Sequence, residues 1–281
     1  MVLLLIVAAA LFALQFLFNK QYKESQGDGL SSVILFALLT NLMNFFLMLA
    51  LNGFSLQFTW FSLLIALAGT ANGLLYTYFS FQALSRVNLS VYSIFAMLGG
   101  MLLPFLSGTL FYHEALTVPK LLCCILIMVS LALTAEKGKG GKKAIISYAA
   151  VFVFNGLSGV ISQIHQSEPE LNTSSENYMA LKSLVAVLVC LVWLLAKERE
   201  FPSIKLKPFC FAGIYSVFSG LGNLFCLIAL TKLDASIQYP LITGGTMVFS
   251  TLISFCAKEK PRLRTVLSML IALGATVLII L

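Results

Sequence analysis

The sequence predicts an all-α polytopic membrane protein that crosses a lipid bilayer ten times. Of its 281 residues, 59% are hydrophobic and only 10% are charged, whereas a soluble domain carries about 25% charged residues. Apolar segments of about 20 residues, the length needed to cross the hydrocarbon core, follow one another along the chain. A surface this poor in charge must face lipid, because it would aggregate in water.

Charged residues fall almost wholly between ten segments, which are residues 2–19, 31–51, 59–82, 88–111, 118–135, 144–164, 178–196, 208–231, 235–257 and 263–281. The first segment has no basic stretch before it, and Lys20 and Lys23 follow it, which favours a retained helix over a signal peptide. The connections at 85–87 and 232–234 are so short that their flanking helices must form antiparallel hairpins. No connection is long enough to hold a soluble catalytic domain.

The positive charge is distributed unevenly between the connections. The net charge is +7, and 15 of the 18 Lys and Arg residues follow the first, third, fifth, seventh and ninth segments. Cytoplasmic loops carry such an excess, so these connections are predicted to be cytoplasmic and both termini to lie outside. Because these cations lie between the membrane segments, the orientation of the loops explains the positive net charge, and no nucleic-acid partner is expected.

The two halves of the chain resemble each other at a spacing of 146 residues. Ala83–Val91 (ALSRVNLSV) matches Ala229–Ile237 (ALTKLDASI), and Gly99 then aligns with Gly245. Each copy holds five segments, an odd number, so the second copy enters the membrane from the opposite face. Inverted repeats of this kind are typical of secondary transporters. We predict repeats at 1–135 and 144–281, joined by a basic cytoplasmic linker at 136–143.

These features resemble the ten-helix EamA-like branch of the drug/metabolite transporter (DMT) superfamily. The resemblance rests on the two short hairpins, on Gly99 and Gly245 in mid-segment, and on Glu114 and Glu259 after the fourth and ninth segments. It covers nearly the whole chain and implies a 5+5 inverted repeat, a central cavity and transport without ATP hydrolysis. It also implies cytoplasmic termini, and here we follow the charge count instead.

Polar side chains inside membrane segments are costly and usually face the bundle interior or a water-filled path. Fourteen are therefore candidate substrate-binding residues: Gln15, Asn19, Asn41, Asn72, Tyr76, Tyr92, Asn155, Ser162, Lys182, Tyr215, Asn223, Gln238, Tyr239 and Thr243. For each one, the alternative is a hydrogen bond that holds two helices together. Pro240 can free a backbone carbonyl, so the stretch before it is expected to face substrate. Segments 118–135 and 263–281 have few polar groups and are predicted to be scaffold or dimer contacts.

Four ionisable side chains need separate treatment. Lys182 is the one formal charge well inside a segment, and it either snorkels to the interface or binds an anion or takes part in proton coupling. Glu114 precedes the fifth segment, where the helix dipole favours a carboxylate, with proton carriage as the alternative. His113 and His165 are too isolated for a metal site and are expected at the membrane interface.

No P-loop, zinc-protease or nucleophile-elbow motif occurs in the sequence. We therefore expect no enzyme and no cofactor, with a proton or ion gradient driving any uphill movement. The predicted function is alternating-access transport, with export implied by the resemblance, of a small neutral, zwitterionic or weakly charged organic metabolite or drug. The expected setting is a bacterial inner membrane, as a monomer or homodimer. The alternative is a non-transporting scaffold or lipid-handling subunit.

Overall fold

The computed structural model describes residues 1–27, 29–84, 89–134, 142–197, 205–256 and 263–280. These ranges form ten α-helices: α1 (Val2–Gln26), α2 (Leu30–Leu51), α3 (Trp60–Leu84), α4 (Leu89–Phe111), α5 (Val118–Thr134), α6 (Lys142–Gln166), α7 (Ser175–Lys197), α8 (Leu206–Leu230), α9 (Ala235–Cys256) and α10 (Leu263–Ile280). Each predicted segment corresponds to one helix. The predicted linker at 136–143 lies outside the described residues up to 141, and α6 begins within it at Lys142.

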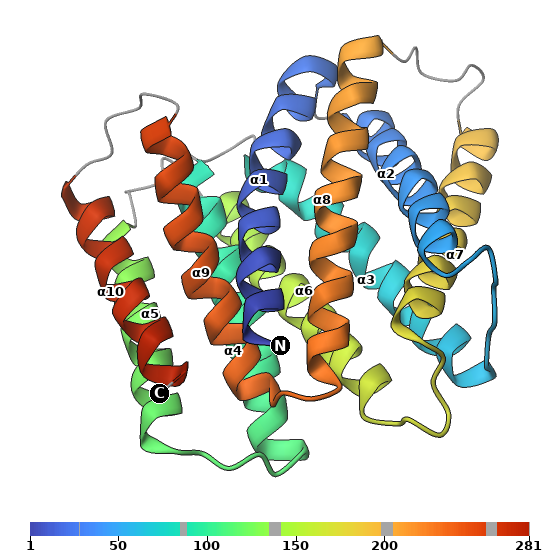
Figure 1. Ribbon diagram of the computed structural model, residues 1–281. Coiled ribbons are helices and arrows are strands. Elements are labelled where there is room, and N and C mark those ends of the chain that lie inside the picture. Colours follow the sequence, from blue (N-terminus) through green and yellow to red (C-terminus); the bar gives the residue numbers. More distant parts are fainter. Residues whose placement is uncertain (28, 85–88, 135–141, 198–204, 257–262, 281) are drawn as a thin grey trace.

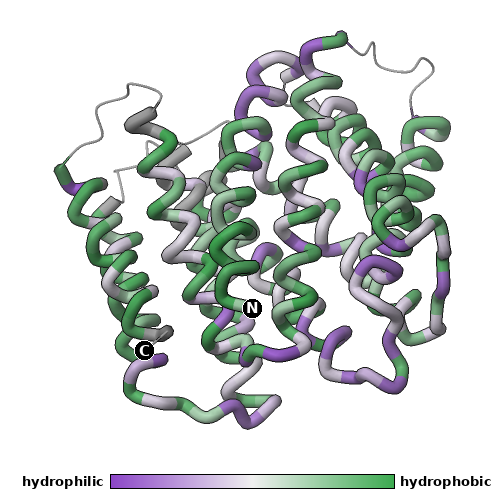
Figure 2. Tube along the Cα trace, in the orientation of Figure 1, coloured by the Kyte–Doolittle hydropathy of each residue, from purple (hydrophilic) through white to green (hydrophobic). Residues whose placement is uncertain are grey.

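Six helices, α1, α2, α3, α6, α7 and α8, are long and apolar enough to cross a membrane. The other four have 17 to 23 residues, and at about 1.5 Å per residue even 17 residues extend roughly 26 Å. Hydrophobic residues follow the helix bodies in Figure 2, and hydrophilic residues gather at helix ends and loops. The protein is thus a multi-pass membrane protein, and ten crossings stay a prediction for α4, α5, α9 and α10.

The first helix extends well beyond its predicted end at residue 19. Its last two turns contain charged residues, and Lys20 and Glu24 form an exposed ion pair at 3.8 Å. The opposite face is apolar in character, because the fully buried ring of Tyr22 packs on Phe36 with 4.6 Å between ring centroids. A criterion based on apolar length ends a segment at its first charge, and therefore missed this amphipathic extension.

Helices from the two halves of the chain pack against each other throughout the bundle. α1 lies beside α8 and α9, α6 lies beside α3 and α4, and α2 packs on α7. α5 and α10 form a pair at one edge, seen at the left of Figure 1. That pair is joined by reciprocal hydrogen bonds between Ser130 and Ser268. The bundle is therefore one body rather than two separate domains.

The crossing of α4 and α6 depends on two glycines. A Cβ atom added at Gly156 would lie 2.6 Å from the carbonyl oxygen of Gly99, and one added at Gly99 would overlap the carbonyl of Phe152. Small residues let membrane helices approach this closely. The short separation lets Asn155 Nδ2 donate to the Ala96 carbonyl at 2.7 Å, which fixes α6 against α4 next to the cavity described below.

Candidate functional site

A cavity of about 310 Å³ lies in the middle of the bundle, between α1, α2, α3, α4, α6, α7, α8 and α9. Its size is at the lower end of the range for small-molecule sites. All of its described lining residues come from these eight helices, and none from α5 or α10. The α5–α10 pair therefore stands apart from the site, in the position expected of a scaffold.

Ten of the fourteen candidate residues line this cavity: Gln15, Asn41, Tyr76, Asn155, Ser162, Lys182, Tyr215, Asn223, Tyr239 and Thr243. On α8 the polar residues Ser216, Ser219 and Asn223 face the cavity together, as their spacing of three and four residues requires. The structure thus brings most of the predicted residues into one space, while their role in binding stays a prediction.

Four candidates lie outside the lining, and they are Asn19, Asn72, Tyr92 and Gln238. Asn72 joins α3 to α6 by donating to Ser158 Oγ at 2.7 Å. The Tyr92 hydroxyl donates to Ser80 Oγ at 3.1 Å and so ties α4 to α3. Asn19 is buried with 7% of its surface exposed. These four residues do not line the cavity, and for Asn72 and Tyr92 the structure shows the alternative that the sequence left open, a hydrogen bond between helices.

The stretch before Pro240 divides between two environments. The Gln238 side chain is fully buried and donates to the Cys226 carbonyl at 3.0 Å, away from the cavity. Tyr239 lines the cavity, and its hydroxyl donates to the Gly159 carbonyl at 3.0 Å. This bond joins α9 to α6. Only one of the two predicted side chains therefore faces the site.

Lys182 lines the cavity from α7. Its Cε and the Tyr178 hydroxyl oxygen both lie 3.3 Å from the point where a Cβ of Gly69 would stand. The absence of a side chain at Gly69 gives these two groups room to converge. Lys182 is half-buried, and it is the one charged residue among the described side chains that line the cavity.

Tyr178 lines the cavity and is 1% exposed, but its role was missed from the sequence. It was not among the candidate residues, and the predicted segment began only at residue 178, whereas α7 begins at Ser175. Its spacing of four residues from Lys182 was a usable signal, because side chains four apart share one helix face. Asn44 also faces the cavity and donates to Ser183 Oγ at 2.7 Å.

His165 is fully buried in the last turn of α6, so it packs inside the protein at a helix end. Its ring stacks on Tyr178 with 3.9 Å between centroids, and its Nε2 lies 3.0 Å from Ser62 Oγ. The Thr173 backbone N–H donates to the same Ser62 oxygen at 3.0 Å. This small cluster supports the Tyr178 ring from behind the cavity wall.

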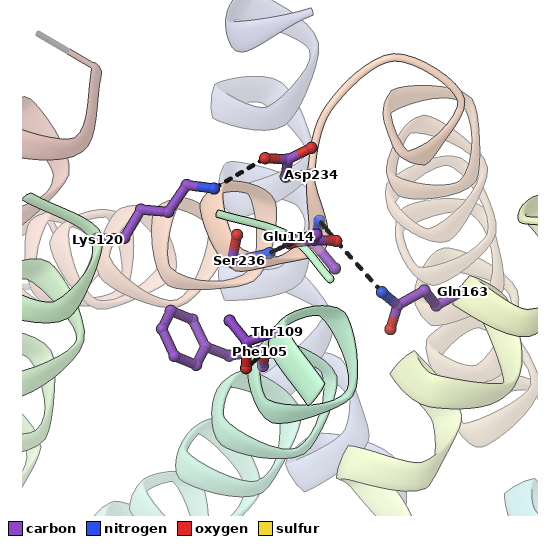
Figure 3. Close-up of polar contacts among 8 residues, drawn as sticks. Phe105, Thr109, Glu114, Lys120, Gln163, Asp234 and Ser236 are labelled. Carbon is purple, nitrogen blue, oxygen red and sulfur yellow. Dashed lines mark hydrogen bonds and ion pairs between the residues drawn. The ribbon is translucent and has the colours of Figure 1, made fainter. Parts of the chain in front are cut away.

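One end of the bundle is held together by Glu114, in the connection between α4 and α5 (Figure 3). Its carboxylate accepts hydrogen bonds from the backbone N–H groups of Ala235 at 2.9 Å and Ser236 at 2.8 Å. Lys120 and Asp234 form an ion pair beside it at 2.8 Å. Glu114 therefore caps the first turn of α9, and not that of α5 as its position in the chain suggested. Its predicted counterpart, Glu259, lies outside the described residues.

Local backbone geometry directs Glu114 toward α9. His113 has a φ of 53°, in the left-handed region that non-glycine residues rarely adopt. The Glu114 N–H bonds back to the Gly108 carbonyl at 3.0 Å, and a Cβ at Gly108 would lie 2.7 Å from the carboxylate. The turn therefore folds the side chain over the end of α4 and across to the second half of the chain.

Further hydrogen bonds join the two halves at the same end. The Asn177 side-chain oxygen accepts from Asn52 Nδ2 at 3.0 Å and from the Gln57 backbone N–H at 2.8 Å. The Thr59 hydroxyl donates to the Leu171 carbonyl. All of these groups lie in or next to the connections that carry few Lys and Arg residues. This end of the bundle is thus extensively cross-linked between halves.

The described residues contain no cluster of His, Cys, Asp and Glu suited to a metal ion. The cysteines whose side chains are described, Cys123, Cys124, Cys190, Cys210 and Cys226, are free thiols. What the cavity offers a ligand is therefore one ammonium group, several amides and hydroxyls, and aromatic rings.

Comparison with known families decides the assignment. The model of the EamA-like transporter family matches residues 142–281, from α6 to the C-terminus. The chain belongs to the EamA-like transporter family. This membership, part of the DMT superfamily, confirms the resemblance noted in the sequence and makes the protein a membrane transporter. A domain of the same family at 1–135 stays a prediction.

Solved structures agree on the fold of this EamA-like transporter. Among 29 matching chains, one crystal structure of a protein aligns with a TM-score of 0.76 over 98% of this chain and 94% of its own. The two are 17% identical, so the likeness shows a shared fold alone. No curated protein matches the sequence.

Proposed function

We propose that this EamA-like transporter moves a small neutral, zwitterionic or weakly charged organic solute by alternating access, as an exporter in a bacterial inner membrane. A proton or ion gradient would supply the energy, and no catalytic step is involved. The observation that carries the proposal is the central cavity, because eight helices from both halves contribute uncharged polar and aromatic side chains to one space. A rigid membrane scaffold has no need of such a space.

The pattern of helix contacts supports two inverted five-helix repeats. In an inverted repeat, each helix corresponds to the helix five places along the chain. The contact α1–α8 then corresponds to α6–α3, α1–α9 to α6–α4, and α2–α8 to α7–α3. All six of these helix pairs are in contact. The pairs α2–α7, α4–α9 and α5–α10 convert into themselves and are also in contact. A pseudo-two-fold axis through these self-paired helices gives such a pattern, and it lets the halves exchange roles.

The cross-linked end supports the alternation of access. Glu114, Asn177 and their partners join the two halves at the end with few Lys and Arg residues. By the charge count this is the outer end, so we propose that the conformation described is closed to the outside. Opening it would require these bonds to break, while equivalent contacts form at the cytoplasmic end.

Transport measured in proteoliposomes tests the proposal. Purified protein is reconstituted and exposed to a panel of neutral, zwitterionic, anionic and cationic metabolites, with and without an imposed proton gradient. We expect saturable, protein-dependent movement of at least one small solute. If no solute moves faster than in protein-free liposomes, and phospholipid instead alters the thermal stability, a lipid-handling subunit becomes the better account.

A further inference from the structure

The central cavity contains a positive charge with no described negative charge to balance it. Lys182 lines the cavity, and the two ion pairs among the described residues involve other lysines, Lys20 and Lys120. The acidic side chains that the structure describes all lie outside the cavity wall, and they are Glu24, Glu114, Glu168, Glu170, Glu176 and Asp234. An ammonium group in a bundle interior without a partner is unfavourable.

We propose that the solute is an amphipathic organic acid with a single carboxylate, and that Lys182 binds this carboxylate. The inference rests on the proposed transport function and specifies its substrate class. Charges inside membrane proteins are normally paired or face a pathway, and an anionic solute supplies the missing partner. The polar groups around Lys182 are otherwise uncharged, so the solute's own charge completes the pair.

A second hydrogen-bond donor stands beside Lys182. The Tyr178 hydroxyl is buried and has no hydrogen-bond partner in the described part of the chain, which is a costly arrangement for a polar group unless a ligand satisfies it. Its oxygen and Lys182 Cε each lie 3.3 Å from the position that a Cβ of Gly69 would take, and the two residues are four apart on α7, which puts them on one helix face. A carboxylate has two oxygens, and these two donors can serve one each. The stacking of His165 holds the tyrosine ring in place.

The number of cations selects a carboxylate over a phosphate. Phosphate esters are usually dianions near neutral pH, and they are recognised by several cations or by arginine forks. The described cavity wall has one lysine and no arginine. A zwitterion would place its own ammonium near Lys182 without a carboxylate to receive it. A net charge of −1 therefore fits the site better than −2 or zero.

The wall also contains a set of apolar and aromatic groups, which include Phe12, Phe16, Phe36, Met97, Tyr215 and Ile242. They come from α1, α2, α4, α8 and α9, whereas Lys182 and Tyr178 come from α7. Aromatic rings supply a large apolar contact area. The body of the acid is therefore aromatic or aliphatic, and small enough for a cavity of about 310 Å³.

Binding of matched acid and amide probes tests this inference. The probes are phenylacetate, indole-3-acetate and octanoate, each paired with its primary amide, and phenylphosphonate at pH 8 as a dianion. Affinities for the purified full-length protein are measured by calorimetry and by ligand-induced shifts in melting temperature. We expect at least one acid to bind tenfold or more tightly than its amide, and phenylphosphonate to bind more weakly than phenylacetate.

Variants assign the preference to the two residues. Lys182→Met and Lys182→Gln should lose the tenfold preference, Lys182→Arg should keep part of it, and Tyr178→Phe should weaken acid binding several-fold without changing amide binding. Lys197→Met is the matched control, because Lys197 is an exposed lysine at the end of the same helix. Two neutral replacements at Lys182 guard against one that fails to fold, as judged by size-exclusion profile.

The inference is overturned if the amides bind as tightly as the acids, if either folded neutral variant keeps the preference, or if no acid binds. A phosphonate preferred over the acids would also overturn it, in favour of a phosphate-bearing solute. None of these results bears on transport itself, because the metabolite panel contains neutral and cationic solutes. Movement of those solutes with no acid binding would leave the proposed function standing and remove only this substrate class.

Discussion

Replacing Glu114 with glutamine should open the end of the bundle that Glu114 now closes. The carboxylate accepts two backbone N–H groups of α9, from Ala235 and Ser236, and it reaches them from the other half of the chain. Glutamine has nearly the same shape, but it offers one acceptor oxygen and no charge. One of the two N–H groups then loses its partner, and the remaining bond becomes a neutral one.

The size of the effect follows from these two bonds. A hydrogen bond to a charged group contributes about 1.5–3 kcal/mol, and a neutral one about 1 kcal/mol. Losing one bond and weakening the other should destabilise the closed end by at least about 2 kcal/mol, which is about a 30-fold or larger change in the closed-to-open ratio. The neighbouring Lys120–Asp234 pair adds little, since Asp234 is half exposed and such pairs contribute about 0–1 kcal/mol.

Pulsed EPR distances can report this ratio. Spin labels at Leu116 and Lys232 would lie on the two connections that meet at this end, and both side chains are exposed. We expect Glu114→Gln to increase the long-distance population by roughly the factor above, while Glu170→Gln, at an exposed carboxylate of the same end, leaves it unchanged. Identical distance distributions in the two variants would refute the role of Glu114 in closing this end of the bundle.

Three further substitutions, and one control, test the packing of the helices. Gly99→Val should reduce the stability by several kcal/mol, measured as a large fall in melting temperature, because the added side chain prevents the close approach of α4 and α6. Gly274→Ala, where an added Cβ meets nothing within 4 Å, should leave the melting temperature unchanged, and an equal effect of both would contradict the crossing. Ser130→Ala removes the bonds that the Ser130 hydroxyl makes to Ser268, while the Ser130 carbonyl still accepts from the Ser268 hydroxyl. It should cost about 1–2 kcal/mol yet leave transport intact, and a transport loss at full stability would contradict the scaffold role. Tyr239→Phe removes the hydrogen bond to the Gly159 carbonyl and should reduce the stability by about 1 kcal/mol, measured by chemical denaturation. An unchanged stability would mean that this bond does not join α9 to α6.

The membrane helices themselves could be predicted because their signal is local. Apolar length and the positions of charges located all ten helices, and the family was recognisable from short motifs. The ends were less accurate where a helix continues past its apolar part. α1 reaches Gln26 with an amphipathic last stretch, and α7 begins at Ser175, three residues before its predicted start.

The direction of each polar side chain was harder to predict. Asn72 and Tyr76 share a face of α3, but only Tyr76 lines the cavity. They differ in depth by one turn, about 6 Å, and at the depth of Asn72 the neighbouring α6 supplies Ser158 as a partner. Thr70 and Gly73 line the cavity at nearly the same depth, so it is the direction of the Asn72 side chain, toward its partner on α6, that keeps it out of the lining. That direction depends on the neighbouring helix, and no local pattern contains this information.

Contacts across the whole chain were beyond prediction for the same reason. Glu114 was expected to act on the helix that follows it, whereas its partners are Ala235 and Ser236, more than a hundred residues later. The convergence of Tyr178 and Lys182 near Gly69 likewise needs α7 and α3 in register. The polar composition of the site could thus be predicted, but the pairing of its groups could not.

Cysteine labelling from both sides of the membrane tests the central claim most directly. A single cysteine is introduced by Ser162→Cys, in the cavity wall, on a background in which the native cysteines are replaced. Ser130→Cys, buried between α5 and α10, serves as the control. If the cavity opens alternately, a membrane-impermeant thiol reagent should modify the Ser162→Cys protein when added to either side of oriented vesicles. Modification from one side only, under every condition that supports transport, would contradict alternating access.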